Sequence, residues 1–163
     1  MKPSDLERRI DELFALPLEE FTKKKNALAK ELSGKDRKQI KALVKPSVAV
    51  WAINQLYFKD RGTYKALVDA SEKRRSAHRS ALSGRKTDLH KVEAVYRSAL
   101  ERAFAKAIGL LEKSNYSISD ATRETVRITL AGLPTDEPPG RMSRPPEPAG
   151  FSLLMPDRGK TKR

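Results

Sequence analysis

The sequence predicts an all-α protein, and three observations carry that prediction. Lys, Arg, Glu, Ala and Leu dominate the chain of 163 residues, while Gly occurs only eight times, and this composition favours helix over strand. Apolar residues recur at helical spacing over most of the chain. Seven of the ten prolines lie beyond Leu133, and proline interrupts helices. We therefore expect a domain of six or seven helices over residues 1–133 and a proline-rich, extended tail over residues 134–163.

The first three predicted helices are amphipathic. Ser4 and Glu7 stand three residues apart, as in a capping box, and predict the start of the first helix. The second helix covers about 17–33 and ends at Ser33-Gly34, and the third covers about 36–44. Their apolar stripes are Leu6, Ile10, Leu13 and Phe14 in the first, Leu18, Phe21, Leu28 and Leu32 in the second, and Ile40, Leu43 and Val44 in the third.

The next segment, KPSVAVWAINQLYFKD at residues 45–60, predicts the central helix of the domain. Pro46 suits the first turn of a helix. From Val48 to Phe58 the apolar side chains point in nearly every direction around a helix, and a helix that is apolar all round is a buried one. We expect a helix over about 46–60 with the other helices packed around it.

Three residues of this central helix carry polar groups that need partners: Trp51, Asn54 and Gln55. A buried amide costs free energy unless its donors and its acceptor are paired. Two arrangements meet that need. Either the amides belong to a polar network within the core, or Asn54 pairs with the backbone of the proline-rich tail, because an extended segment has free N–H and C=O groups.

A long antiparallel hairpin is predicted over about 63–113. Thr63 is expected to cap its first helix, about 63–83, and Asp88 its second, about 88–113. The connection between them is short, so the two helices should lie side by side. We expect the first helix to face inward through Tyr64, Leu67, Val68, His78 and Leu82.

One more helix, about 119–132, is expected to begin at a Ser117 or Ser119 cap, and the tail follows it. The tail contains one apolar island, Phe151 to Met155, which we expect to pack partly on the helices. The last residues, RGKTKR, predict a disordered basic end.

The chain carries a net charge of +13, and two segments account for all of it. Residues 23–45 hold nine Lys or Arg against Glu31 and Asp36, and residues 73–91 hold seven against Asp88. Clustered cations favour a polyanionic partner, either nucleic acid or an acidic protein. The candidate nucleic-acid-binding residues are Lys23, Lys24, Lys25, Lys35, Arg37, Lys38 and Lys41 in the first segment, and Arg74, Arg75, Arg79, Arg85 and Lys86 in the second.

These charges admit three interpretations. Because no zinc-finger, helix-turn-helix or RNP pattern accompanies them, nucleic acid would be bound through its phosphate backbone with little sequence specificity. In the alternative, the protein is an adaptor or an assembly subunit, including one that forms homo-oligomers, and its basic segments meet an acidic partner. In the third, they are solvated helix faces. One continuous basic face would favour nucleic acid, whereas two faces on opposite sides would favour solvation.

Little in the sequence predicts catalysis, a metal or a cofactor. There are no cysteines, and His78 and His90 have no paired carboxylates at ligand spacing, so we expect no metal site. No nucleotide-binding glycine loop and no nucleophile elbow occurs, and we expect a non-enzymatic protein without a cofactor. The absence of a signal-peptide pattern and of an apolar run of membrane-spanning length predicts a cytoplasmic protein.

Three stretches resemble a mainly bacterial family of helical proteins for which no activity is established. Residues 15–32 match L-P-x-x-E-F-T-x-x-x-N-x-L-x-K, residues 45–58 match K-P-S-V-x-x-W-A-x-N-Q-L, and the tail matches G-R-[LM]-[ST] followed by P-x-G-F. The matching tail residues are Gly140, Arg141, Met142, Ser143, Pro148, Gly150 and Phe151. The resemblance implies a shared pattern that includes Glu20, Phe21, Thr22, Asn26, Lys45, Trp51, Asn54 and Gln55.

Overall fold

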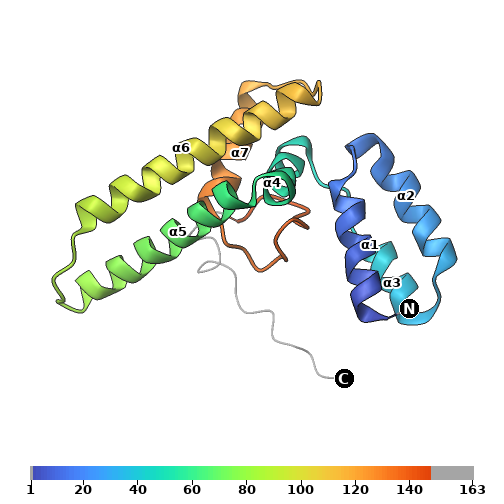
Figure 1. Ribbon diagram of the computed structural model, residues 1–163, viewed down its shortest axis with the longest axis horizontal. Helices are drawn as coiled ribbons and strands as arrows, with labels where there is room; N and C mark the ends of the chain where they lie inside the picture. The colour runs from blue at the N-terminus through green and yellow to red at the C-terminus, as the bar shows by residue number, and fades with distance from the viewer. Residues whose placement is uncertain (1, 148–163) are drawn as a thin grey trace.

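The structure is a computed structural model that describes residues 2–147, and within this range it contains seven helices and no strand (Figure 1). This confirms the all-α class. The helices are α1 (Pro3–Ala15), α2 (Leu18–Glu31), α3 (Gly34–Ala42), α4 (Val48–Lys59), α5 (Arg61–Leu82), α6 (Leu89–Lys113) and α7 (Asp120–Ala131).

The helices enclose two hydrophobic cores. The first lies among α1, α2 and α3, where the rings of Phe14 and Phe21 meet edge to face with their centroids 5.3 Å apart. The second is built by α4 to α7 together with Leu18 of α2, Leu133 and Met142. Figure 1 shows α1–α3 at one end of the molecule, the α5–α6 hairpin reaching to the other, and α4 between them.

Helix α4 is the buried helix expected at the centre. Every side chain from Ala49 to Leu56 is buried, and α4 contacts α1, α5, α6 and α7. Its N-terminus is capped by Ser47, whose hydroxyl accepts the N–H of Val50 at 3.4 Å. Because neighbours cover it on several sides, an all-round apolar surface is what this position requires.

Two of the predicted helix caps are confirmed. Asp88 accepts the N–H of Lys91 at 3.0 Å at the start of α6. Ser119 accepts the N–H of Thr122 at 3.1 Å at the start of α7. In both helices a side-chain oxygen satisfies a first-turn N–H that has no partner within the helix.

The two other predicted caps are wrong. Helix α1 begins at Pro3 without a side-chain cap, because proline has no N–H to satisfy and its ring already holds a helical φ. Helix α5 begins at Arg61, two residues before the expected start, and its cap is Asp60. The Asp60 carboxylate accepts both the N–H and the hydroxyl of Thr63, at 3.1 and 2.8 Å, so Thr63 is the donor in this cap.

The α5–α6 hairpin has its two helices side by side, as expected, but its inner face is shorter than predicted (Figure 1). Tyr64 and Leu67 are buried, and Val68 packs against the same core. His78 is exposed, and Leu82 is 90% exposed. Both lie at the C-terminal end of α5, and the end of the hairpin lies away from α4 and α7 (Figure 1).

The tail leaves α7 and returns to the helices. Its Leu133–Pro134 peptide bond is cis, and the side chain of Met142 is only 1% exposed, inside the second core. The segment from Pro134 to Glu147 forms no helix or strand, in agreement with its proline content. The predicted contact through Phe151 to Met155 and the predicted disordered end lie outside the described residues.

Candidate nucleic-acid interface

Four of the candidate cations project from α3. Lys35, Arg37, Lys38 and Lys41 are all exposed, and Ile40 is the only residue of this nine-residue helix that is buried. They will be called the α3 basic set. None of them forms an ion pair within the described part of the chain.

The three consecutive lysines of α2 have different environments. Lys23 is exposed to solvent. Lys25 donates from Nζ to the carbonyl oxygen of Leu43 at 3.0 Å, so it satisfies the C-terminus of α3 and is committed to the fold. Lys24 lines a groove of about 370 Å³ between α1 and α2.

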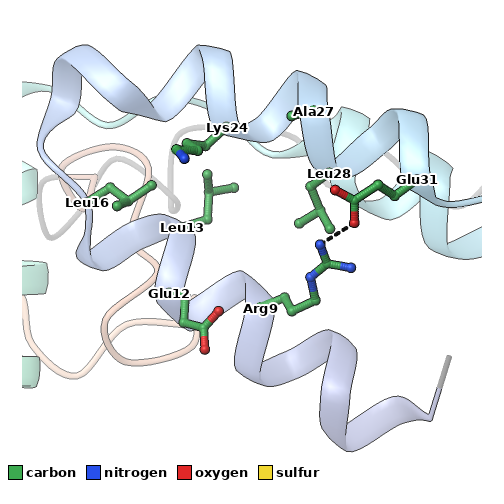
Figure 2. Close-up of a pocket in the computed structure, with 8 residues that line it drawn as sticks. All are labelled: Arg9, Glu12, Leu13, Leu16, Lys24, Ala27, Leu28 and Glu31. Carbon is green, nitrogen blue, oxygen red and sulfur yellow. Dashed lines mark hydrogen bonds and ion pairs between the residues drawn. The ribbon is translucent and has the colours of Figure 1, made fainter.

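The groove beside Lys24 is not a polyanion site, because its charges are balanced. Figure 2 shows Lys24 extending from α2 toward Leu13 of α1 and Leu16, which follows α1, with Arg9 and Glu31 ion-paired farther along. Glu12 also lines the groove. Two cations and two carboxylates around an apolar floor create no net field that would attract phosphate.

At the free end of the hairpin, four further candidates are exposed. Arg75 and Arg79 lie four residues apart on α5, and Arg85 and Lys86 lie in the loop that leads to α6. These four will be called the tip basic set. Like the α3 basic set, they have no ion pair among the residues that the structure describes. Each side chain is therefore available to an anion from solution.

Arg74, in contrast, is committed to the hairpin itself. Its Nε donates to Glu93 at 2.8 Å, and its guanidinium lies 4.5 Å from the ring centroid of Tyr96. His78 Nε2 lies 2.7 Å from the same carboxylate oxygen. The hydrogen bonds from Arg74 and His78 lower the pKa of Glu93. Arg74 thus connects α5 to α6, and it is the one Lys or Arg of residues 73–91 in an ion pair within residues 2–147.

Cations elsewhere in the described part of the chain are ion-paired more often than those of the two segments. Within the described range, no Lys or Arg of residues 23–45 is ion-paired, although these residues include nine cations. Outside the two segments, ion pairs are formed by Arg8, Arg9, Lys65, Lys106, Arg127 and Arg141. Pairing with acids therefore accounts for many of the other cations but not for the clustered ones.

The two basic sets do not form one continuous face. Helix α3 lies at one end of the long axis of the molecule and the hairpin loop at the other (Figure 1). The two-sided arrangement was the one expected to favour solvation. The two sets are therefore two separate basic regions of the described part of the protein.

The three polar residues of α4 hold distant backbone groups. Asn54 donates from Nδ2 to the carbonyl of Met142 at 2.9 Å and accepts the Met142 N–H at Oδ1 at 3.0 Å. This is the tail contact that the sequence left open beside a core network. Trp51 Nε1 donates to the carbonyl of Leu16 at 2.8 Å, and Gln55 Nε2 to that of Phe14 at 2.9 Å. Trp51 and Gln55 thus serve the C-terminal end of α1.

The two buried amides of α4 are closed to solvent and bonded to backbone groups. Asn54 is fully buried, and both its Nδ2 and its Oδ1 hydrogen-bond to Met142. Gln55 is equally buried, and its Oε1 is the one buried side-chain N or O without a partner among residues 2–147. Glu20 is exposed. These three residues do not line a common polar pocket.

Two further residues connect the tail and α4 to α1 and α2, and their contacts were not predicted from the sequence. Arg141 donates from Nε to Asp11 at 2.7 Å and also forms an ion pair with Glu7. Tyr116 accepts the N–H of Leu18 at 3.0 Å, and its ring meets Trp51 edge to face at 4.9 Å. For Arg141, the G-R-[LM]-[ST] match marked the position but gave no partner. No local signal marks Tyr116, because its contacts lie far away in the sequence.

Residues 2–147 contain no group of three or more His, Asp or Glu side chains that would hold a metal ion. Of the helices described, none combines the length and the apolarity needed to cross a bilayer. No family model, curated protein or solved structure matches this chain. The resemblance to a bacterial helical family therefore stays a prediction.

Proposed function

We propose that the protein is a non-enzymatic binder of nucleic acid that contacts the phosphate backbone through the α3 basic set and the tip basic set. The observation that carries this proposal is the absence of acidic partners for these eight side chains within the described residues. Exposed cations that are clustered and have no acidic partner create a positive electrostatic potential, and this potential attracts an anionic ligand.

The separation of the two sets defines the kind of binding. Each set offers four cations, enough for a few phosphates, and neither includes an aromatic side chain for stacking bases. Binding should be weak at each set, insensitive to sequence and strongly dependent on salt. Because the sets lie at opposite ends (Figure 1), one molecule is able to contact two nucleic-acid segments at once.

The test is the salt dependence of binding to short duplexes and single strands, measured for the native chain and two variants. One variant changes Lys35, Arg37, Lys38 and Lys41 to Gln, and the other changes Arg75, Arg79, Arg85 and Lys86 to Gln. If a whole set binds phosphates, its loss should reduce the slope of log K against log salt by up to about three to four.

A matched control separates a binding surface from net charge. Lys59, Arg97, Lys113 and Arg123 are exposed and belong to neither set, and changing these four to Gln removes the same charge. This control should change the slope by less than either test variant. Equal effects of all three variants, or no binding by the native chain at low salt, would contradict the proposal and leave the clusters as solvated surface.

A further inference from the structure

The α5–α6 hairpin carries an open groove that belongs to neither basic set. A hollow of about 460 Å³ lies between the two helices, and a second of about 210 Å³ shares Lys91 and Val95 with it. Both hollows are lined by α5 and α6 alone. Because they share residues, they form one groove along the hairpin.

The floor of the groove is apolar and uncovered. It is lined by Ala66, Ala70, Val92, Ala94, Val95 and Ala99. Val95 is 52% exposed and is one of only four large hydrophobic side chains exposed in the described part of the chain. A groove between two packed helices is the shape that a third helix fills. On α5 the lining runs from Thr63 to Lys73, a length of roughly 15 Å or three helical turns.

Every ionisable side chain that lines the groove is a cation. They are Lys73, Lys91 and Arg102, and none is in an ion pair among residues 2–147. An apolar floor with a cationic rim complements a helix that has an apolar ridge flanked by carboxylates. Both the shape and the charge therefore describe the same kind of occupant.

Charge argues against two occupants from this chain. In any self-paired arrangement of the groove with a second copy, its lining would contribute only cations to both sides of the interface. The C-terminal segment 148–163 is also excluded by its sign, since it carries Arg158, Lys160, Lys162 and Arg163 against Asp157 alone. Like charges facing one another across an interface cost free energy.

Shape and chemistry argue against nucleic acid and membrane in the groove. The apolar floor gives a phosphate backbone no polar partner, and the lining contains no aromatic side chain on which bases would stack. A bilayer surface is flat, whereas a hollow between two helices is filled by a ridge. An acidic amphipathic helix of another protein satisfies both the concave apolar floor and the cationic rim.

We propose that this groove is the docking site for an acidic amphipathic helix, about three turns long, in a partner protein. The proposal goes beyond the nucleic-acid proposal and is independent of it, because none of the groove residues belongs to the two basic sets. Its failure would leave the nucleic-acid proposal standing, and the reverse also holds.

The probe is a labelled synthetic helical peptide with Leu at positions i, i+3, i+4 and i+7 and Glu on both flanks, titrated with the full chain. Val95→Asp should weaken its binding at least about tenfold by placing a carboxylate on the apolar floor. Leu82→Asp is the matched control: it also replaces an exposed apolar residue of the hairpin with Asp, but Leu82 lies outside the groove. The affinity of the Leu82→Asp variant for the peptide should stay within about twofold of that of the native chain.

A charge swap tests the rim separately. In the double variant Lys73→Glu, Lys91→Glu, the preference should change from the Glu-flanked peptide to the same peptide with Lys in place of Glu. Both residues are exposed, and circular dichroism checks that the variants keep their helices. Failure of the native chain to bind the Glu-flanked peptide, equal weakening by the two Asp variants, or an unchanged preference in the swap would each overturn the proposal.

Discussion

Asn54 is the residue that most directly holds the tail on the helices. Its amide replaces, for Met142, the partners that a strand or helix would have supplied. Ser71 makes a related contact, because its hydroxyl donates to the carbonyl of Leu133 at 2.9 Å. Ser71 thus holds the start of the tail at Leu133, and Asn54 holds it again at Met142. Only Asn54 pairs with both a backbone N–H and a backbone C=O.

Replacing Asn54 with Leu should destabilise the protein by about 2 kcal/mol or more, since a buried N–H and a buried C=O would lose their partner. Denaturant unfolding measures the stability, and hydrogen exchange at Met142 should become faster. Affinity for nucleic acid should not change. Ser71→Ala, which removes one bond to a carbonyl, should cost less. Native stability together with lost binding would show that Asn54 is a binding residue.

Gly140 illustrates a second requirement at the residue scale. It has a φ of 79°, and a Cβ at this position would lie 2.5 Å from Cδ1 of Tyr57 and 2.8 Å from Cζ of Phe58. Gly84 has nearly the same φ, 78°, but a Cβ there would meet nothing within 4 Å. Comparing Gly140 with Gly84 therefore distinguishes the cost of a steric clash from the cost of the backbone conformation, because the two glycines have nearly the same φ.

Changing Gly140 to Ala should therefore cost more than changing Gly84 to Ala, by about 1–3 kcal/mol, which is the usual cost of overpacking. Both variants carry the strain of a left-handed backbone conformation. Thermal or denaturant unfolding of the two variants measures the difference. Equal losses of stability would mean that the rings of Tyr57 and Phe58 move aside without cost.

At the scale of elements, the start of α5 depends on one carboxylate. Hydrogen bonds from the hydroxyl and the N–H of Thr63 lower the pKa of Asp60, and the nearby charges of Lys106 and Arg102 act in the same direction. A carboxylate with a lowered folded-state pKa contributes stability above its unfolded pKa, near 4. That stability is lost as the pH falls through the folded pKa.

Asp60→Ala should therefore destabilise the protein by about 1 kcal/mol at neutral pH, the usual value of an N-cap. The difference from the native chain should shrink as the pH falls below about 4, where the native carboxylate also becomes protonated. Urea unfolding across this pH range measures it. A difference that stays constant down to pH 2 would contradict the role given to the charged form.

Element existence was easier to predict than element boundaries. All seven helices were expected, because their apolar spacing and their turn residues are local signals. The starts of α1 and α5 were wrong, and α3 and α4 begin at Gly34 and Val48 rather than at about 36 and 46. Asp60 and Thr63 lie three residues apart and hydrogen-bond one another, and the sequence does not tell which of two neighbouring polar residues is the acceptor of the cap.

At the scale of the whole molecule, two cores are joined by α4 and by the tail. From α4, Trp51 and Gln55 hydrogen-bond to backbone carbonyls at the C-terminal end of α1. From the tail, Arg141 hydrogen-bonds to the side chain of Asp11 in α1. Burial acts to lower the pKa of Arg141, but hydrogen bonds to Asp11 and Glu7 raise it overall. The guanidinium stays charged and links the tail to the α1–α3 end of the molecule.

Replacing Arg141 with Met should loosen the α1–α3 core more than the rest. We expect a loss of about 1–2 kcal/mol, because its acidic partners are partly exposed and solvent screens the pairs. The increase in the rate of hydrogen exchange caused by Arg141→Met should be larger in α1 and α2 than in α6 and α7. Arg144→Met is the matched control, since Arg144 is exposed and outside the ion pairs described. A uniform change along the chain would contradict this linking role.

The sequence by itself determined the helices, the buried central position of α4 and the two clusters of cations, because periodicity and composition are properties of short segments. The tertiary structure alone decided which cations remain unpaired and that the clusters lie at opposite ends. It also chose between the two arrangements open to Asn54. These outcomes depend on contacts between side chains and backbone groups that are far apart in the sequence, and a local sequence pattern does not specify such long-range contacts.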